Sequence, residues 1–369
     1  MKIRLLKHLD KILGTVLSRL LFAPQSRVAR PVNKVLVIRP GGLGDAVHLI
    51  PAIIALRKSF PGVAIDILAE KRNGAVFSLV QGISNVFHYD KFHELLQVYN
   101  SRYDLVIDTE QWHRLSAVVA RLTRASMLVG FDTNDRSRLF THKVLYSHDD
   151  YETDSFLGLL APLDMAARPD FPSRFLSIPF SAAEKSGELL GALAAQRFVA
   201  IFPGATIPER RWGAERFAVV TERLFNNGIP SVVIGGRSES SDGNLIVAGG
   251  HGLNLAGRTS LAETAAVIDK CAVLVSGDSG ILHIAVGLGK PTVSLFGPGI
   301  ARKWAPRGDR HTVINKCLPC SPCTRFGYTP KCPIRARCMA DITVNEVVAS
   351  IEHLIGRCFD GKDGINPGR

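Results

Sequence analysis

A single acid stands in a glycine-rich turn near the start of the sequence. Residues 37–61 read VIRPGGLGDAVHLIPAIIALRKSFP, which predicts a buried strand, a tight turn and an amphipathic helix. A helix N-terminus after such a turn commonly binds phosphate, which the carboxylate of Asp45 would repel. The turn also lacks the Gly-Lys-Ser/Thr of a P-loop, and Val47 stands where a dinucleotide fingerprint needs a third glycine or alanine. Asp45 therefore either caps the helix or has a chemical role of its own.

A second turn, in residues 275–298, combines groups suited to a phosphate and to a sugar. Its sequence, VSGDSGILHIAVGLGKPTVSLFGP, predicts a strand that ends at Ser276, a tight turn and a helix. Backbone N–H groups at the helix N-terminus can bind a phosphate, and a carboxylate accepts hydrogen bonds from sugar hydroxyls. The alternative is an ordinary capped helix with a satisfied histidine. The candidate binding residues of this turn are Asp278, Ser279, Gly280, Ile281 and His283.

Three other turns in the second half carry similar groups. FPGATIPERRWGAERF, at 202–217, offers hydroxyl and guanidinium donors for a diphosphate, and we expect its tryptophan to pack in the core. IGGRSES, at 234–240, places an acid where dinucleotide folds bind ribose hydroxyls. The turn at 259–260 either contributes a hydroxyl or caps a helix. Together these turns predict a pocket for a nucleotide diphosphate-sugar. The candidates are Thr206, Arg210, Arg211, Glu239 and Thr259.

The elements that must position these residues alternate between strand and helix in both halves of the chain. A less regular, proline-containing stretch at 149–196 separates the halves. Such alternation predicts an α/β protein with two Rossmann-like domains whose parallel sheets face a central cleft, where ligands bind. The expected strands are 35–38, 65–69, 86–89, 105–108, 198–202, 231–234, 273–276 and 292–296. The expected divisions are an N-terminal helix at 1–30, domains at 31–180 and 181–345, and a C-terminal helix and tail at 346–369.

Composition restricts the class of protein without choosing its partner. The chain has 369 residues, 46% hydrophobic and 21% charged, which is ordinary for a globular protein with two domains. No apolar run reaches the length of about 20 residues that a membrane-spanning helix needs. The net charge of +12 favours anionic partners such as nucleotides, nucleic acid or a lipid surface.

Residues 1–30 predict a basic amphipathic helix. Leucine, isoleucine and valine recur at helical spacing, and lysine and arginine occupy the other positions. Such a helix either lies on anionic lipid, as a peripheral membrane contact, or packs on the protein's own surface. The segment has neither the unbroken apolar core nor the cleavage site of a secretory signal.

Five of the seven cysteines fall within residues 317–338. Crowding of this kind in a large α/β chain indicates a reducing compartment and either a metal or a packed loop. Four thiolates would suit a structural zinc or iron site, and the chosen ligands are Cys320, Cys323, Cys332 and Cys338. Because the segment follows all the donor motifs and is rich in proline, we expect a structural loop that takes no part in the chemistry.

The motifs follow one another as in glycosyltransferase family nine, the heptosyltransferases of lipopolysaccharide assembly, which the chain resembles over about residues 34–300. Besides the first turn, the matching stretches are PGATIPERRWGAERF, GGRSE, LAGRTSLAETAAVI and DSGILHIAVGLGKPTVSLFGP. The resemblance implies a GT-B fold, a nucleotide-sugar donor, usually ADP-heptose, and inversion at the anomeric carbon. It implies that the C-terminal domain binds the donor and the N-terminal domain the acceptor, in the cytoplasm at the inner face of the inner membrane.

By this resemblance Asp45 is the general base. The chemistry agrees, since an inverting transfer needs one carboxylate to take the acceptor proton, and a helix dipole holds that carboxylate ionised. Arg39 and His48 are expected to contact the acceptor or a phosphate, and Asp108 heads a group of acceptor candidates in VIDTEQWHR. The cysteine loop is similar to loops in relatives that glycosylate proteins and carry an iron-binding finger.

The sequence therefore predicts an inverting transferase of a heptose-like sugar from a nucleotide diphosphate donor to a lipopolysaccharide or other cell-surface glycan. No cofactor is expected for catalysis, and no nucleic acid as partner. Two alternatives stay open: a protein O-glycosyltransferase of the same family, and a nucleotide- or nucleic-acid-binding module with a cysteine metal finger. The last lacks the aromatic and basic interleaving of single-strand binders.

Overall fold

Each half of the chain folds around one parallel sheet of six strands. The computed structural model describes residues 10–22, 31–165, 172–325 and 328–359. The chain divides into two units, Met1–Phe171 and Pro172–Arg369, so the α/β architecture with two parallel sheets is confirmed. The division precedes residue 181 because the backbone N–H groups of Phe175 and Leu176 donate to Gly287 O of the second unit, 2.8 and 2.9 Å away.

The sheet of the first unit has the strand order β3-β2-β1-β4-β5-β6. The order reverses between β1 and β4, and in open α/β sheets that position is where ligands bind, beyond the carboxyl ends of the strands. The strands are β1 Lys34–Arg39, β2 Ala64–Ala69, β3 Asn85–His88, β4 Leu105–Asp108, β5 Met127–Phe131 and β6 His142–Val144. The α-helices of this unit are α2 Thr15–Leu20, α3 Leu43–Ser59, α4 Phe92–Asn100, α5 Arg114–Leu122 and α6 Glu152–Gly158.

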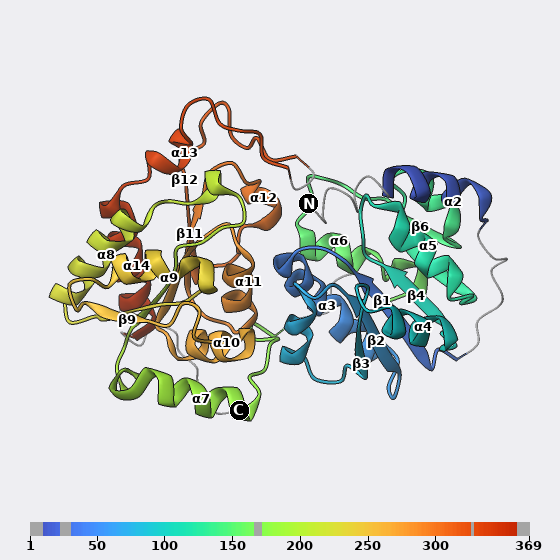
Figure 1. The fold of residues 1–369 in the computed structure, drawn as a ribbon, viewed down its shortest axis with the longest axis horizontal. Coiled ribbons are helices and arrows are strands. Elements are labelled where there is room, and N and C mark those ends of the chain that lie inside the picture. Colours follow the sequence, from blue (N-terminus) through green and yellow to red (C-terminus); the bar gives the residue numbers. More distant parts are fainter. Residues whose placement is uncertain (1–9, 23–30, 166–171, 326–327, 360–369) are drawn as a thin grey trace, which may run out of the picture. The chain divides into compact units, whose positions relative to one another are not determined.

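Burial on both faces of this sheet explains its continuous hydrophobic strands. Leu36 and Ile38 of β1 belong to a core cluster that α4 and α5 cover. Val35 and Val37, which point to the opposite face, are just as buried. Helices lie along the sheet of this unit (Figure 1). Parallel strands covered on both faces lack the polar alternation of half-exposed strands, as the sequence led us to expect.

The sheet of the second unit repeats this topology, with the order β12-β11-β10-β7-β8-β9 and the reversal between β7 and β10. Its strands are β7 Val199–Phe202, β8 Ser231–Val233, β9 Gly252–Asn254, β10 Val273–Gly277, β11 Thr292–Phe296 and β12 His311–Asn315. Its α-helices are α7 Phe180–Leu190, α8 Ala214–Asn226, α9 Ser240–Ile246, α10 Leu261–Lys270, α11 Gly280–Gly287, α12 Ala301–Trp304, α13 Arg337–Ala340 and α14 Val344–Phe359.

The sequence prediction missed the strands β5, β6, β9 and β12. β6 and β9 have three residues each and are edge strands, so neither presents a buried run long enough to recognise. β12 is the other edge of the second sheet, and most of its residues are only half-buried. β5, in contrast, is a buried strand with the pattern MLVGF, and its signal was overlooked.

The N-terminal segment packs on the first unit. Residues Asp10–Gly14 form a π-helical turn that continues into α2, and α2 contacts α5. Asp10 Oδ1 accepts hydrogen bonds from the backbone N–H groups of Arg114 and Leu115, each 2.8 Å long, and so caps α5. The rest of the helix predicted at 1–30 lies outside the described residues. Within the ranges that the structure describes, no helix is long and apolar enough to cross a membrane.

Trp212 lies in the core of the second unit, as the sequence predicts. Its side chain is 4% exposed and its indole Nε1–H donates to Ile342 O at 3.0 Å, which ties the start of α8 to the segment before α14.

Replacing Trp212 with phenylalanine should lower the free energy of unfolding of the second unit by about 1–3 kcal/mol, because the change leaves the carbonyl of Ile342 without its donor. Urea unfolding followed by circular dichroism measures the change. Phe225→Leu, at an exposed site on the same helix, is the control and should leave the midpoint unchanged.

Candidate active site

The turn between β1 and α3 brings the Asp45 carboxylate back toward the end of β1. Gly41 has φ +108°, a conformation that side chains rarely adopt. A Cβ on Gly42 would lie 3.2 Å from Asp45 Oδ2, so this position also favours glycine. Asp45 lies in the first turn of α3, at the positive end of the helix dipole, and its side chain is 31% exposed. The geometry leaves a carboxylate accessible at the carboxyl end of the sheet.

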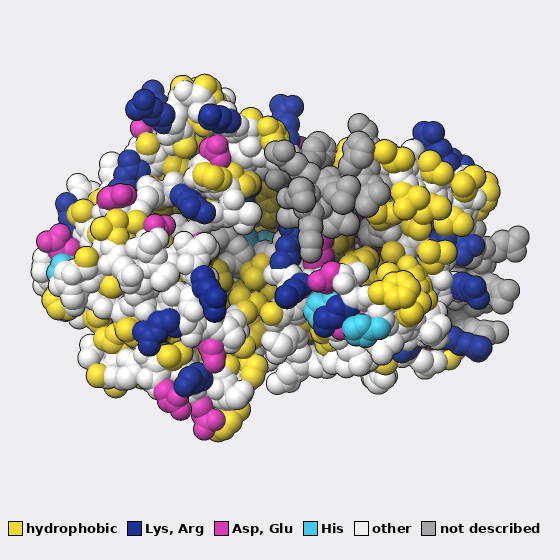
Figure 2. All heavy atoms as spheres, viewed as in Figure 1, with side chains coloured by type: hydrophobic (Ala, Val, Ile, Leu, Met, Phe, Trp, Pro, Cys, Tyr) yellow, Lys and Arg dark blue, Asp and Glu magenta, His cyan; other side chains and the backbone are white. Residues whose placement is uncertain are grey.

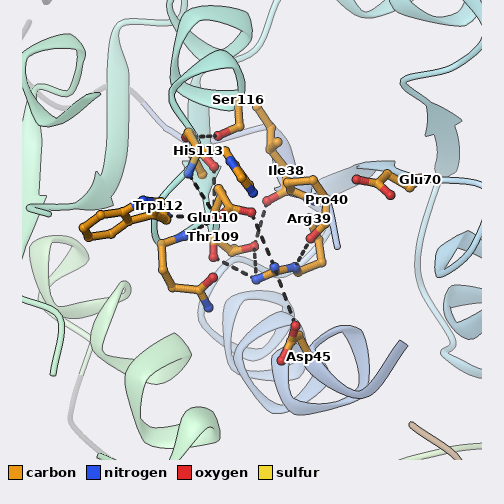
Figure 3. Close-up of polar contacts among 12 residues, drawn as sticks. Ile38, Arg39, Pro40, Asp45, Glu70, Thr109, Glu110, Trp112, His113 and Ser116 are labelled. Atoms are coloured by element: carbon orange, nitrogen blue, oxygen red, sulfur yellow. Dashed lines mark hydrogen bonds and ion pairs between the residues drawn. The ribbon is translucent and has the colours of Figure 1, made fainter. Parts of the chain in front are cut away.

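A buried arginine joins the two strands at the reversal point of this sheet. Arg39 is 2% exposed, and its guanidinium donates to Pro40 O at 2.6 Å and to Thr109 O at 2.9 Å. Its Nη2 lies 3.9 Å from Asp45 Oδ2 and 3.8 Å from Glu110 Oε2 (Figure 3). The sequence analysis expected Arg39 to contact the acceptor or a phosphate. In the structure its guanidinium points into the protein, where it holds Asp45 in place.

Asp108 lies deeper than the sequence analysis expected. Its side chain is fully buried, and Arg136 Nη2 lies 2.5 Å from its Oδ2. Burial raises the pKa of Asp108, and the charge of Arg136 works against that rise. Arg136 is itself fully buried. With its carboxylate enclosed, Asp108 supports the loop after β4, and its contact with an acceptor stays a prediction.

His48 is also buried, at 5% exposed. Its Nδ1 lies 2.8 Å from Thr153 Oγ1, and its ring packs edge-on against Tyr151. The residue therefore joins α3 to α6. Contact with an acceptor or a phosphate, which the sequence analysis expected of His48, stays a prediction.

Two residues near Asp45 were missed from the sequence, Tyr146 and Glu152. Tyr146 Oη donates to Glu152 Oε2 at 3.4 Å, and Gln111 Nε2 donates to Glu152 Oε1 at 2.5 Å. Burial, with the charges of Glu152 and Asp45, raises the pKa of Tyr146, so its phenol stays protonated. The signal available was the acidic and aromatic cluster YSHDDYETD at 146–154, which overlaps the start of the stretch treated as irregular, 149–196.

In the second unit an ion pair spans the corresponding reversal point. Arg210 Nη1, after β7, lies 2.8 Å from Asp278 Oδ2, after β10. Arg210 is partly exposed and Asp278 is buried at 7%. The two residues were assigned from the sequence to a diphosphate and to sugar hydroxyls, and the structure brings them together. Gly299 packs on the same carboxylate, since a Cβ there would overlap Asp278 Oδ2.

The helix α11 begins directly after this ion pair. Ser279 is its N-cap, and the Ser279 hydroxyl accepts from Leu282 N at 3.3 Å and bonds to Ser276 Oγ at 2.8 Å. Its side chain is thus used as a cap, the alternative named from the sequence. The first N–H groups of the helix, at Gly280 and Ile281, remain at its positive end. His283 is 4% exposed and lies within the packed face of α11.

Glu239 follows β8, beside β7. Its carboxylate accepts from Gly236 N at 2.8 Å and from Ser238 Oγ at 2.7 Å. A Cβ on Gly204 would lie 2.7 Å from the Glu239 side chain, so the loop after β7 passes directly over this acid. Glu239 therefore lies against the loop that follows β7, the loop that also carries Arg210.

Three other predicted donor residues are less closely associated with that pair. Thr206 is exposed, and Arg211 is exposed with its Nε donating to Ala205 O at 3.0 Å. Thr259 Oγ1 bonds to Thr264 Oγ1 at 2.8 Å, while the neighbouring Ser260 forms a capping box with Glu263. The turn at 259–260 thus has the local hydrogen bonds of a helix start.

The four chosen cysteines line one small cavity of the second unit, together with Glu209 and Pro298. The segment is held at the end of β11, because Cys323 N and Thr324 N donate to Pro298 O at 3.2 and 3.0 Å. It also reaches the donor loop, since Arg210 Nη2 lies 3.5 Å from Thr324 Oγ1. The cysteine loop therefore contacts a donor candidate, although it follows all the donor motifs in the sequence.

Four thiols around one cavity are the donors that zinc or iron prefers. Their arrangement does not complete a site, because no group of three or more histidine, cysteine, aspartate or glutamate side chains is placed to hold a metal ion within the described ranges. Burial raises the pKa values of Cys323 and Cys338, and the neighbouring cysteines add to the rise. The structural metal stays a prediction, and no chemical step depends on it.

The two parallel six-stranded sheets define the fold class of an α/β protein with two units, and comparison with known proteins gives its family. The sequence model of glycosyltransferase family 9 (heptosyltransferase) matches residues 93–332. That match covers more than half of the chain. The chain belongs to this family.

Individual relatives extend the match over most of the chain. Lipopolysaccharide heptosyltransferase 2 of Salmonella typhimurium is 24% identical over 305 residues, which cover 76% of this chain and 87% of that protein. The solved structure of the E. coli ADP-heptose lipopolysaccharide heptosyltransferase II has a TM-score of 0.73 at 21% identity and covers 88% of this chain and 99% of that one. The iron-containing dodecameric glycosyltransferase TibC of enterotoxigenic E. coli has a TM-score of 0.59 at 14% identity, with 92% and 78% covered.

Replacing Cys320 and Cys323 together with serine should lower the melting temperature of the protein, because the change places two hydroxyls in the lining of the cavity. The contact between Thr324 and Arg210 leads us to expect weaker donor binding as well, by a few-fold. Differential scanning calorimetry and titration with ADP measure the two effects.

Cys317→Ser is the matched control for this double variant, because Cys317 is an exposed cysteine of the same segment that does not line the cavity. It should leave both the melting temperature and the affinity for ADP unchanged. An unchanged melting temperature in the double variant would refute the structural role. Zinc or iron missing from anaerobically purified protein would refute the metal.

Proposed function

We propose that the chain is an inverting heptosyltransferase that moves a heptose-like sugar from ADP-heptose to a lipopolysaccharide or another cell-surface glycan. The observation that carries the proposal is the accessible Asp45 carboxylate at the reversal point of a Rossmann-like sheet. Buried Arg39 contacts this carboxylate from the side of the sheet. Family membership establishes the class of enzyme. The donor, the acceptor and the stereochemistry are the proposed part.

In this mechanism Asp45 is the general base. Its carboxylate takes the proton from an acceptor hydroxyl as the hydroxyl oxygen bonds to the anomeric carbon of the donor sugar. The bond from that carbon to the diphosphate oxygen breaks in the same step, and the electron pair leaves with the diphosphate. A single displacement of this kind inverts the anomeric configuration. Arg39 positions the base from the buried side of the turn.

We assign the stabilisation of the leaving diphosphate to the second unit. Arg210 and the positive end of α11 supply donors and charge at the carboxyl end of the sheet. Asp278 accepts hydrogen bonds from sugar hydroxyls, and its partner Arg210 orients it. Glu239, at the end of the neighbouring strand, is placed as an acceptor for the ribose hydroxyls.

The printed names of the relatives support the choice of substrates. The Salmonella protein is a lipopolysaccharide heptosyltransferase, and the E. coli structure is that of an ADP-heptose enzyme. Such an acceptor is a glycolipid, so we place the reaction in the cytoplasm at the inner face of the inner membrane. No nucleic acid is needed as a partner.

A protein acceptor is the second candidate. The cavity lined by four cysteines favours it, because the cysteine loop is similar to loops of family members that glycosylate proteins. Incubation with radiolabelled ADP-heptose and a membrane extract separates the two, since the label enters either glycolipid or a protease-sensitive fraction.

Asp45→Asn should abolish most transfer while leaving donor binding intact. The amide keeps the size of the side chain but does not accept a proton, and loss of a general base typically costs about 100- to 10,000-fold in rate. Turnover on ADP-heptose and calorimetric binding of ADP measure the two properties. Asp90→Asn, an exposed acid of the same unit, is the matched control. Transfer near the wild-type rate would remove Asp45 from the mechanism.

Asp278 and Arg210 should differ in which part of the donor they bind. Asp278→Ala should weaken binding of ADP-heptose by roughly 1.5–3 kcal/mol more than binding of ADP, because it removes an acceptor for sugar hydroxyls. Arg210→Gln should weaken both ligands alike, since both carry the diphosphate. Isothermal titration of the two ligands with each variant gives the comparison. Equal losses for ADP and ADP-heptose in Asp278→Ala would contradict the sugar contact.

A further inference from the structure

The helix α2 has two apolar faces, and only one of them is covered by the protein. Leu17 and Leu21 pack against the core cluster of the first unit, and Ser18 is fully buried. The opposite side chains remain exposed although they are large and apolar. We call them the apolar ridge: Ile12 at 56% exposed, Leu13 at 47%, Val16 at 49%, Leu20 at 68% and Phe22 at 65%.

These residues form one continuous surface. Positions 12, 13, 16 and 20 follow the spacing that puts side chains on the same side of a helix, and Phe22 extends the row beyond its end. Leu122, at the end of the neighbouring helix α5, is 45% exposed. Figure 2 shows hydrophobic side chains gathered over the region of α2. Contiguous exposed apolar surface of this kind marks a site of contact with another apolar phase.

The charges around the ridge are basic. Arg19 lies on α2 between the exposed and the buried faces, and its side chain is 64% exposed. Arg138 is exposed and lies over the ring of Phe22, with its guanidinium carbon 5.9 Å from the ring centroid. Arg121 donates from Nε to Phe22 O. Asp135 pairs with Arg19, and the charges of Arg121 and Arg138 make the edge of the ridge cationic.

The ridge is held rigidly to the domain. Asp10 Oδ1 binds the first N–H groups of α5, and Asp10 Oδ2 lies 3.4 Å from His113 Nδ1. A cap that joins the start of the segment to α5, together with the packed leucines of α2, fixes which face of the helix points outward. These contacts therefore fix the apolar side chains of the ridge on the outside of the first unit.

We infer that the apolar ridge docks on an anionic lipid bilayer. Apolar side chains on one side of a helix that lies flat enter the boundary between head groups and acyl chains, and flanking arginines bind the anionic head groups. The net charge of +12 adds long-range attraction to such a surface. If the ridge of a second copy of the chain docked here, the arginines at the edges of the two ridges would repel each other. Charge complementarity therefore favours anionic lipid over a second copy.

Sedimentation with sucrose-loaded vesicles tests the inference on the full chain without donor or acceptor, so the result does not depend on the proposed reaction. The variant Val16→Glu with Leu20→Glu changes two exposed residues. The control, Phe180→Glu with Leu245→Glu, places the same two charges on exposed apolar positions of the second unit. We expect the wild type and the control to bind phosphatidylglycerol-containing vesicles, and the ridge variant to lose at least about tenfold in partitioning.

Arg19→Gln with Arg138→Gln should reduce the preference for phosphatidylglycerol over pure phosphatidylcholine, and added salt should do the same to the wild type. Equal partitioning of the ridge variant and its control, at unchanged melting temperatures, would overturn the inference. So would a wild type that leaves the vesicles unbound, or one that forms an oligomer which the ridge variant alone dissociates. The last outcome, read by sedimentation velocity, would identify a second copy as the occupant.

Discussion

Two strands lie side by side at the centre of each sheet, β1 and β4 in the first unit and β7 and β10 in the second, and the strands beyond them are added in opposite directions. This reversal leaves the carboxyl ends of the central pair uncovered by crossing connections, so the loops after them are free to carry function. Asp45 and Glu110 follow the pair in the first unit, and Arg210 and Asp278 follow the pair in the second. The chemistry of the protein depends on this constraint, because it brings together residues that lie far apart in the sequence.

The same topology carries different charges in the two units. In the first unit the loops gather acids around the buried cation of Arg39, and a protonated Tyr146 lies close to Asp45. That arrangement suits removal of a proton from a neutral hydroxyl and would repel a diphosphate. In the second unit a helix N-terminus and Arg210 surround the Asp278 carboxylate, which suits a sugar bound to a diphosphate. In the proposed mechanism, the acid at the start of α3 is the base that acts on the acceptor hydroxyl.

Periodicity and glycine turns predicted most of the central strands, because buried parallel strands are continuous runs of valine, isoleucine and leucine. The edge strands β6, β9 and β12 gave weaker patterns. Asp45, Arg210 and Asp278 were found because turns after strands are visible in sequence. The placement of Arg39 and Asp108 could not be found in this way. An arginine or an aspartate at the end of a strand is interpreted as a ligand-binding residue until its burial is known. The link between Tyr146, Glu152 and Gln111 depends on the packing of α6, which no spacing in the sequence reports.

The central claim is a single displacement at the anomeric carbon with Asp45 as the base. The most direct measurement is the anomeric configuration of the transferred sugar, determined by nuclear magnetic resonance on the product of purified enzyme, ADP-heptose and a lipopolysaccharide that lacks heptose. The account predicts a product whose configuration is opposite to that of the donor. A product with the donor's configuration would exclude a single displacement from the opposite face and contradict the mechanism.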